Sequence, residues 1–167
     1  MDMLIGGKRA SGTRIIDVVD PAKNEVVDTV PFASEEDLEL ALSSSLEGYR
    51  EWSSMTILER NRILHHYAAL VEDHRAELRM LLCRENGKNI KNTDMEFDAV
   101  NALFTGYAEQ AAHLYGNTMP NGNQLTSPAE DLVFTRWESI GVVVCLIPFN
   151  FPVDLYAEKV APALAAG

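Results

Sequence analysis

The spacing of hydrophobic residues along the chain changes twice. Short apolar stretches at 3–10, 13–19 and 26–30 alternate with Gly, Pro and Asn turns, which predicts an amino-terminal region of antiparallel hairpins. From 34 to 116 the apolar residues recur at helical spacing, which predicts a series of amphipathic helices. From Ile140 the chain becomes continuously apolar, which is typical of a strand buried on both faces.

Local signals place the ends of these helices. Three capping-box patterns predict helix starts, namely Ser34 with Asp37, Thr56 with Glu59 and Thr93 with Glu96. A break is expected near Asp73-His74, and helix ends are expected at Asn86-Gly87 and at Gly116. Tyr49 and Trp52 continue the apolar stripe of the first helix, so we interpret them as core rather than as a wall on which a ligand stacks.

The last segment predicts a strand, a tight loop and a helix. Five β-branched residues lie within 140–147, and Pro148 should end the strand because it has no N–H for a ladder. From Val153 the alanine-rich pattern favours a helix that ends at Gly167, with a kink or break at Pro162. This order is the first half of a βαβ unit, so the chain is expected to be an α/β protein.

The loop from Pro148 to Pro152 is the candidate functional loop. In open α/β sheets, ligands bind at the carboxyl ends of the strands, where this loop lies. Asn150 offers an uncharged amide donor, which could stabilise an oxyanion that develops on a carbonyl. Asn also commonly hydrogen-bonds its own turn, so the residue pattern leaves that alternative open.

Charge and composition exclude some classes of partner. The 167 residues carry a formal net charge of −11, with a sequence pI of about 4.7. An acidic surface argues against nucleic-acid binding by counterion release and against binding to an anionic membrane surface. No signal peptide and no transmembrane run is recognisable, so a cytoplasmic location is expected.

Cysteines and histidines give no metal site. Cys83 and Cys145 are interpreted as small buried hydrophobic residues without a disulfide, as in a reducing compartment. His65, His66 and His74 lack the H-E-x-x-H spacing and any completing ligand, so no metal is predicted. Gly87-Lys88 lacks the glycine-rich surroundings of a phosphate loop.

Three segments together resemble the aldehyde dehydrogenase superfamily: LIGGKRASG, VDPAKNEVVDTVPFASEEDLELAL and GVVVCLIPFNFPVDLYAEKVAPALAAG. The last segment is similar to the family pattern G-V-V-x-x-I-x-P-[WF]-N-[FY]-P followed by K-x-A-P-A-L-A-A-G. The chain departs from the pattern in two places. Phe149 stands where tryptophan is commoner, and Lys23-Asn24 replaces a Thr-Gly pair in a turn, where Asn tolerates positive φ.

The resemblance implies roles for particular residues. Asn150 matches the oxyanion-hole asparagine. Ile147, Pro148 and Phe149, together with Asn150, match positions that line the nicotinamide-ribose side of the cofactor cleft. Lys159 matches a lysine of a proton relay. The implied reaction oxidises a small-molecule aldehyde to a carboxylic acid through a thiohemiacetal and thioester, with NAD or NADP, of which NAD is preferred.

The resemblance also implies a division of the chain. Residues 1–116 would be strands and helices of the cofactor-binding domain, 117–138 a loop and strand of an oligomerisation arm, and 139–167 the first strand, loop and helix of a Rossmann-like parallel sheet. The nucleophilic cysteine and the general-base glutamate match nothing here, since neither Cys83 nor Cys145 fits. The chain is therefore expected to be an amino-terminal portion that is inactive alone, within a homo-oligomeric enzyme.

Three alternatives remain from the sequence. The chain could be a non-catalytic, truncated relative that acts only by self-association or by pairing with another subunit. The enzyme could instead be an acylating relative that passes the acyl group to coenzyme A. A cofactor-binding module without catalysis is the third alternative.

Overall fold

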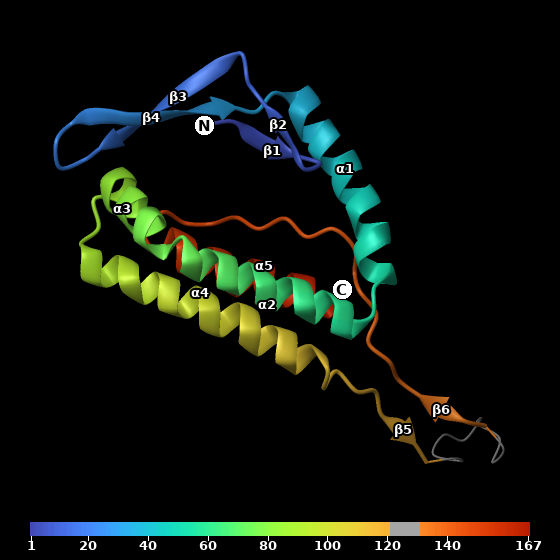
Figure 1. The fold of residues 1–167 in the computed structure, drawn as a ribbon. Coiled ribbons are helices and arrows are strands. Elements are labelled where there is room, and N and C mark those ends of the chain that lie inside the picture. Colours follow the sequence, from blue (N-terminus) through green and yellow to red (C-terminus); the bar gives the residue numbers. More distant parts are fainter. Residues whose placement is uncertain (121–130) are drawn as a thin grey trace.

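The computed structural model describes residues 1–120 and 131–167, and it contains strands, helices and one long unpaired segment (Figure 1). The amino-terminal strands are β1 (Met3–Ile5), β2 (Lys8–Ala10), β3 (Arg14–Asp20) and β4 (Glu25–Phe32). They are followed by α1 (Glu35–Ser54), α2 (Ile57–Asp73), α3 (Arg75–Asn86), α4 (Ile90–Ala111), β5 (Thr118–Met119), β6 (Val133–Phe134) and α5 (Pro152–Ala166). This mixture of hairpins and helices confirms the predicted α/β class.

The amino-terminal strands form two antiparallel hairpins, as predicted. β1 pairs with β2 across the Gly6-Gly7 turn, with Leu4 opposite Arg9. β3 pairs with β4, and the register shifts at Val18/Val19. Asn24 in the connecting turn has φ 56°, so the positive φ expected of this turn is confirmed.

Two of the three predicted helix starts are confirmed. Ser34 caps α1 in a reciprocal capping box with Asp37, and Thr56 caps α2 in the same way with Glu59. The break at His74 and the end of α3 at Gly87 are also confirmed. Gly87 adopts the left-handed conformation with φ 75°, and a Cβ there would lie 2.5 Å from Pro21 Cγ, so only glycine fits without displacement.

The third predicted start is wrong. α4 begins at Ile90, and Asn89 is its N-cap, with its side chain accepting a hydrogen bond from the backbone N–H of Asn92. Thr93 and Glu96 therefore lie inside the helix, and both are buried. Asn is as good an N-cap as Thr. The Glu96 carboxylate instead accepts hydrogen bonds from backbone N–H groups at the start of α5. The same helix ends at Ala111, five residues before the expected Gly116.

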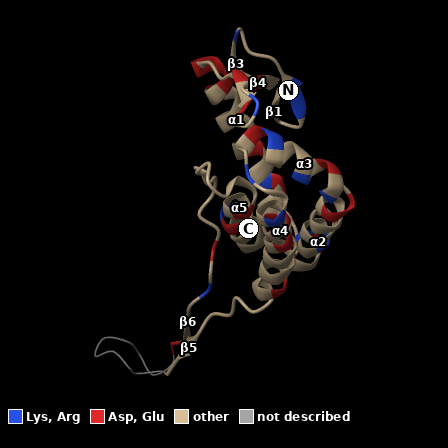
Figure 2. Ribbon diagram, turned by 90° about the vertical axis from the view of Figure 1, so that its left-hand side faces the viewer, with Lys and Arg blue, Asp and Glu red and all other residues tan. Residues whose placement is uncertain are grey.

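The core lies between three helices, and α4 packs against both α2 and α5, between which it lies in Figure 2. Its buried residues are Leu64, Ala68, Val100, Phe104, Ala108, Ala111, Ala157, Ala161 and Ala165. The three alanines of α5 recur at a spacing of four, so they form one face that lets this helix approach α4 closely. Pro162 does not break α5, because the helix is held along this buried face.

The predicted burial of α1 is wrong for most of its apolar stripe. Leu38, Leu42 and Leu46 are exposed, because no described element covers that face, and α1 is drawn beside β1 rather than within the helical layer (Figure 1). The carboxyl-terminal turns do contribute to the fold. Trp52 packs against the core and donates from Nε1 to the carbonyl of Leu164 at 2.8 Å, which agrees with its interpretation as scaffold.

The predicted buried strand at 140–147 is also not realised among the described residues. The segment has no strand partner and crosses the molecule as a single trace before α5 (Figure 1). Ile140 is 91% exposed, and Val144 and Leu146 are exposed as well. Strand pairing and burial need neighbours on both edges and cover on both faces, which the described residues do not supply. Cys145 lies in this uncovered segment and is therefore only partly buried. Cys83 in α3 is also partly buried rather than buried, and both cysteines are free thiols.

β5 and β6 form a two-stranded antiparallel pair, with Thr118 opposite Phe134. The loop and strand predicted for 117–138 are thus corrected at both ends, since 118–119 is a strand and the later strand is shorter than expected. In two perpendicular views the pair stands clear of the helices (Figures 1 and 2). The part of the predicted loop from 121 to 130 lies outside the described residues.

Among the helices that the structure describes, none combines the length and the apolar character needed to cross a membrane. The longest, α4, carries charged residues along its exposed face.

Replacing Phe104 with Ala should lower the free energy of unfolding by about 3–5 kcal/mol, because Phe104 is fully buried between α2 and α5 and the change leaves a cavity. Urea unfolding followed by circular dichroism measures the change. Leu58→Ala on the exposed face of α2 is the control and should stay within about 0.5 kcal/mol. Equal losses in the two variants would contradict the placement of the core.

Candidate functional site

The loop that precedes α5 holds the candidate residues, and α5 begins without a side-chain cap from this loop. Phe151 is the N-cap of α5, and its side chain makes no capping hydrogen bond. Pro152 at the first position has no N–H to satisfy, which suits proline there. The N–H of Leu155 bonds the Phe151 carbonyl at 2.9 Å. The N–H groups of Val153 and Asp154 therefore need acceptors from outside the helix.

Glu96, which projects from the second turn of α4, supplies those acceptors. Its Oε2 accepts from the N–H of Val153 at 2.9 Å and from the N–H of Asp154 at 3.2 Å. The side chain of Glu96 is only 1% exposed. A buried carboxylate at a helix N-terminus is favoured by the helix dipole as well as by these bonds. Every backbone donor in the first turn of α5 is thereby paired.

Lys88 compensates the charge of Glu96. Its Nζ forms an ion pair and hydrogen bond with Glu96 Oε1, and the Lys88 side chain is 8% exposed. The same Nζ donates to the backbone carbonyl of Asn150 at 2.5 Å and lies 3.9 Å from the centre of the Phe151 ring. An ammonium group has three donors, and three partners surround it here.

A second contact holds the loop from the end of α3. Asn86 Nδ2 donates to the backbone carbonyl of Phe149 at 2.7 Å. Two successive carbonyls of the loop, those of Phe149 and Asn150, are thus bound by side chains that lie next to Gly87. Asn150 itself is exposed, and its carboxamide has no hydrogen-bond partner among the described residues. The alternative in which this side chain bonds its own turn is therefore not what the structure has.

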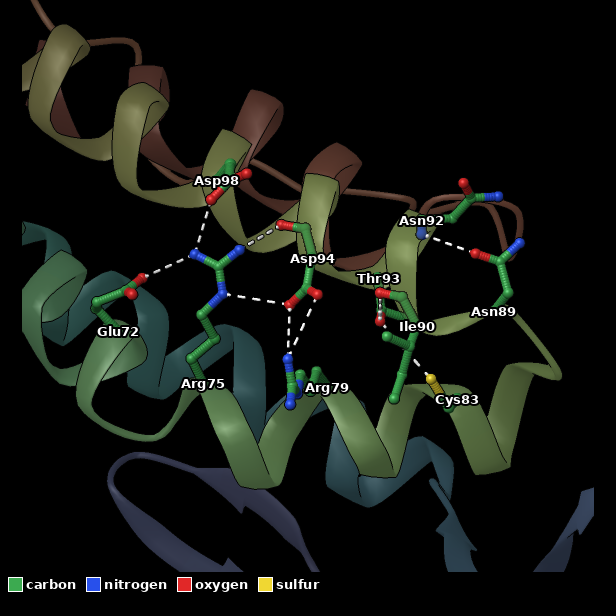
Figure 3. A network of polar contacts seen from close by, with 10 residues as sticks. All are labelled: Glu72, Arg75, Arg79, Cys83, Asn89, Ile90, Asn92, Thr93, Asp94 and Asp98. Carbon is green, nitrogen blue, oxygen red and sulfur yellow. Dashed lines mark hydrogen bonds and ion pairs between the residues drawn. The ribbon is translucent and has the colours of Figure 1, made fainter.

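The connection that carries Asn86 and Lys88 is anchored by a charge network between α3 and α4 (Figure 3). Arg75 pairs with Asp98 at 2.7 Å and donates to the carbonyl of Asp94 at 2.8 Å. Arg79 pairs with the Asp94 carboxylate at 3.3 Å. Because Arg75 and Arg79 lie on α3 and both aspartates on α4, the network fixes how the two helices meet at residues 87–89.

The remaining predicted site residues lie in different surroundings. Ile147 is partly buried and lines an apolar pocket of about 440 Å³ with Tyr67, Glu85 and Tyr156. Pro148 is exposed, and Phe149 is 84% exposed. Lys159 is exposed on α5, seven residues beyond Pro152, which is about 10 Å along the helix axis. The structure shows no contact between Lys159 and Asn150 among the described residues.

Burial shifts the acid–base behaviour of three groups around the loop. Desolvation raises the pKa of Tyr67, with Tyr156 adding to the effect, so the Tyr67 hydroxyl stays protonated. Desolvation also raises the pKa of Glu85 in the apolar pocket. The pKa of Asp154 is raised by desolvation and by the negative charges of Glu158 and Glu96, although Lys88 opposes this.

Lys88 and Glu96 were not recognised as site residues from the sequence. Glu96 carries the signature of a capping-box acid, but it caps a helix 57 residues further along the chain. The sequence does contain one indication of a distant acceptor. The expected helix start at Phe151-Pro152 has no Ser, Thr, Asp or Asn to cap it. Such a start, followed by a buried helix, indicates that an acceptor must come from elsewhere in the fold.

Comparisons with known proteins identify the family of this chain. Residues 8–167 match the family described as "Aldehyde dehydrogenase family". The chain is similar to a D-glyceraldehyde dehydrogenase (NADP(+)) of Thermoplasma acidophilum, with 30% identity over 158 residues, which are 95% of this chain and 31% of the relative.

Solved structures show the same fold. An NADP-dependent glyceraldehyde-3-phosphate dehydrogenase from Bacillus halodurans, complexed with NADP, superposes with a TM-score of 0.95 at 26% identity, covering 99% of this chain and 35% of the other. A NAD-dependent benzaldehyde dehydrogenase from Corynebacterium glutamicum gives 0.90 at 27% identity, with 99% and 36% covered. The chain thus spans about a third of the length of the relatives it matches.

Replacing Asp154 with Asn should stabilise the protein at neutral pH and not at low pH. Because the folded-state pKa of Asp154 is raised, the folded state binds this proton more tightly than the unfolded chain does. The wild-type free energy of unfolding therefore falls as pH rises from 3.8, the ordinary pKa of an aspartate, through the raised folded-state pKa. Urea unfolding of both proteins from pH 3.5 to pH 7 measures the difference, and a gap that shrinks with rising pH would contradict the assignment.

Proposed function

Because the chain belongs to the aldehyde dehydrogenase family, we propose that the protein oxidises a small-molecule aldehyde to a carboxylic acid with NAD or NADP. The chain spans about a third of its relatives' length, so this activity is that of the intact protein. The similar enzymes are described as NADP-dependent in two cases and as NAD-dependent in one. They give no support to the preference for NAD over NADP.

The observation that carries the proposal is the state of Asn150. Its carboxamide has no partner among the described residues, while its backbone carbonyl and that of Phe149 are both held by hydrogen bonds. A donor of this kind can bind an oxygen that becomes negatively charged without first breaking another hydrogen bond. In the proposed reaction, a nucleophile adds to the aldehyde carbon, and the Asn150 amide donates to the carbonyl oxygen as its charge develops.

The residues around Asn150 fit a nicotinamide cofactor in their chemistry. Pro148 and Phe149 present an exposed apolar surface with one aromatic face, which suits packing against a flat heteroaromatic ring. When bound, the cofactor accepts a hydride from the substrate. The part assigned to these two residues is to hold the ring beside Asn150 and keep water from that side. Ile147, which lines the apolar pocket, is assigned to the same side of the cofactor site. Lys159 is proposed to carry a proton.

Replacing Asn150 with Ala in the intact protein should lower kcat for aldehyde oxidation by about 10²–10³-fold, because one oxyanion donor is lost. Cofactor affinity should be nearly unchanged, since the backbone of the loop is kept. The absorbance of the reduced cofactor measures kcat, and calorimetry measures the affinity. Asn92→Ala, at an exposed position in the first turn of α4, is the matched control. An unchanged kcat in Asn150→Ala would remove Asn150 from the mechanism.

We also propose that β5 and β6 take part in a homo-oligomeric interface. Within the described residues these two strands pair only with each other, so each leaves an open edge. Leu132 and Phe134 are exposed there, the latter by 61%. The pair stands clear of the helices in both views (Figures 1 and 2). Open edges with exposed apolar side chains favour pairing with another chain.

Replacing Phe134 with Glu should shift the intact protein to a smaller species, because a charge on an open strand edge opposes strand pairing. Size-exclusion chromatography with light scattering measures the molar mass. Leu58→Glu, an equally exposed apolar position on α2, serves as the control and should leave the mass unchanged. If Phe134→Glu and the wild type have the same mass, the interface lies elsewhere.

A further inference from the structure

A buried ion pair contacts the loop that carries Asn150, and a buried ion pair is by itself weak evidence of a role in stability. Glu96 and Lys88 are 1% and 8% exposed, so both charges are almost fully removed from water. Desolvation of two charges often outweighs their attraction, and apolar residues of similar volume frequently give equal or greater stability. The arrangement of the partners points to a different use.

The two members of the pair bind different parts of the backbone, one at Asn150 and one at the start of α5. Lys88 Nζ binds the carbonyl of Asn150, and Glu96 binds the N–H groups of Val153 and Asp154, three and four residues later. The two side chains also bind each other. The ion pair therefore joins the loop and the first turn of α5 into one hydrogen-bonded unit. Lys88 binds the loop carbonyl of Asn150, Glu96 binds the N–H groups at the start of α5, and the two side chains connect these two places.

The surroundings remove the remaining freedom of this unit. Phe151 covers the Lys88 ammonium with its ring, and Asn86 holds the preceding carbonyl of Phe149. The α3–α4 connection that supplies Asn86 and Lys88 is fixed in turn by Arg75 and its aspartate partners (Figure 3). Among the described residues, the contacts at Asn150 are made by its backbone carbonyl and not by its side chain.

We propose that Lys88 and Glu96 are positioning residues that act on the reaction through Asn150. The inference rests on the proposed function, since it supposes that the Asn150 amide donates to the reacting oxygen. Neither side chain touches the substrate in this proposal. Their part is to set the position of the Asn150 backbone, and displacements of about 1 Å in such groups lower rates by as much as about 10²-fold.

A double-mutant cycle in the intact protein tests the proposal. Lys88→Met should lower kcat by roughly 10–100-fold in the wild-type background. In the Asn150→Ala background the same change should lower kcat by less than about twofold, because residues that act as one unit have non-additive effects. A merely structural role would give losses that multiply. Lys91→Met, an exposed lysine in the first turn of α4, is the matched control and should match wild type in both backgrounds.

Lys88→Met leaves the Glu96 carboxylate buried and unpaired, so this variant could fail to fold. Lys88→Met combined with Glu96→Gln removes both charges and keeps an amide oxygen for the α5 N–H groups. It should fold and still show the reduced, non-additive kcat, because the Asn150 carbonyl has lost its donor. Full activity in this folded double variant would overturn the proposal.

Hydrogen exchange separates this proposal from the proposed function. Backbone amides of 149–151 and 153–155 should exchange faster in Lys88→Met with Glu96→Gln than in wild type, whether or not an aldehyde is oxidised. If the wild type shows no dehydrogenase activity but exchange is accelerated, the proposed function fails and the loop-holding role stands. If Asn150→Ala loses activity while the Lys88 variants keep wild-type kcat and exchange, the positioning role fails alone.

Discussion

The carboxylate of Glu96 is the point at which α4, α5 and the loop between 148 and 151 are held together. It accepts two backbone N–H groups of α5 and the ammonium of Lys88, and its side chain is almost completely buried. Without it, the first turn of α5 would have two unpaired donors in a buried setting, which is unfavourable by about 1–3 kcal/mol for each group. The start of α5 thus depends on a residue of another helix.

The alanine face of α5 makes this arrangement possible. Ala157, Ala161 and Ala165 are buried against α4, and their small side chains let the two helices lie close together. Close approach brings the second turn of α4, where Glu96 lies, within hydrogen-bond reach of the backbone of α5. Larger side chains on this face would separate the helices and leave the carboxylate without its backbone partners. Packing and polar contacts are therefore coupled here.

Exposed apolar side chains line a groove beside α5. The stripe of α1 and the segment 140–147 are both largely uncovered, and together with α5 they border an apolar groove that includes Tyr49, Trp52 and Val143. The burial that the apolar pattern of these two segments predicts is therefore not supplied by the described residues.

The sequence by itself determined the elements whose signals are local. Ser34 and Thr56 cap their helices because their partners lie three residues away, and Asn24 and Gly87 take positive φ because few other residues tolerate it. Asn150 was identified as a candidate from its place in the Pro-Phe-Asn-Phe-Pro loop and from the family resemblance. Its role is still a proposal.

Only the tertiary structure decided what depends on distant partners. The burial expected for 140–147 and for α1 requires neighbours that the pattern of apolar residues cannot supply. Glu96 was expected to cap its own helix with Thr93, whereas it caps α5, because a capping carboxylate looks the same in the sequence whether its backbone partners are local or 57 residues away. Lys88 gave no signal at all, since its partners, the Asn150 carbonyl and the Phe151 ring, come together only when α4 and α5 pack. Side-chain type and spacing specify local hydrogen bonds, whereas contacts between distant segments are set by the packing of the helices that carry them.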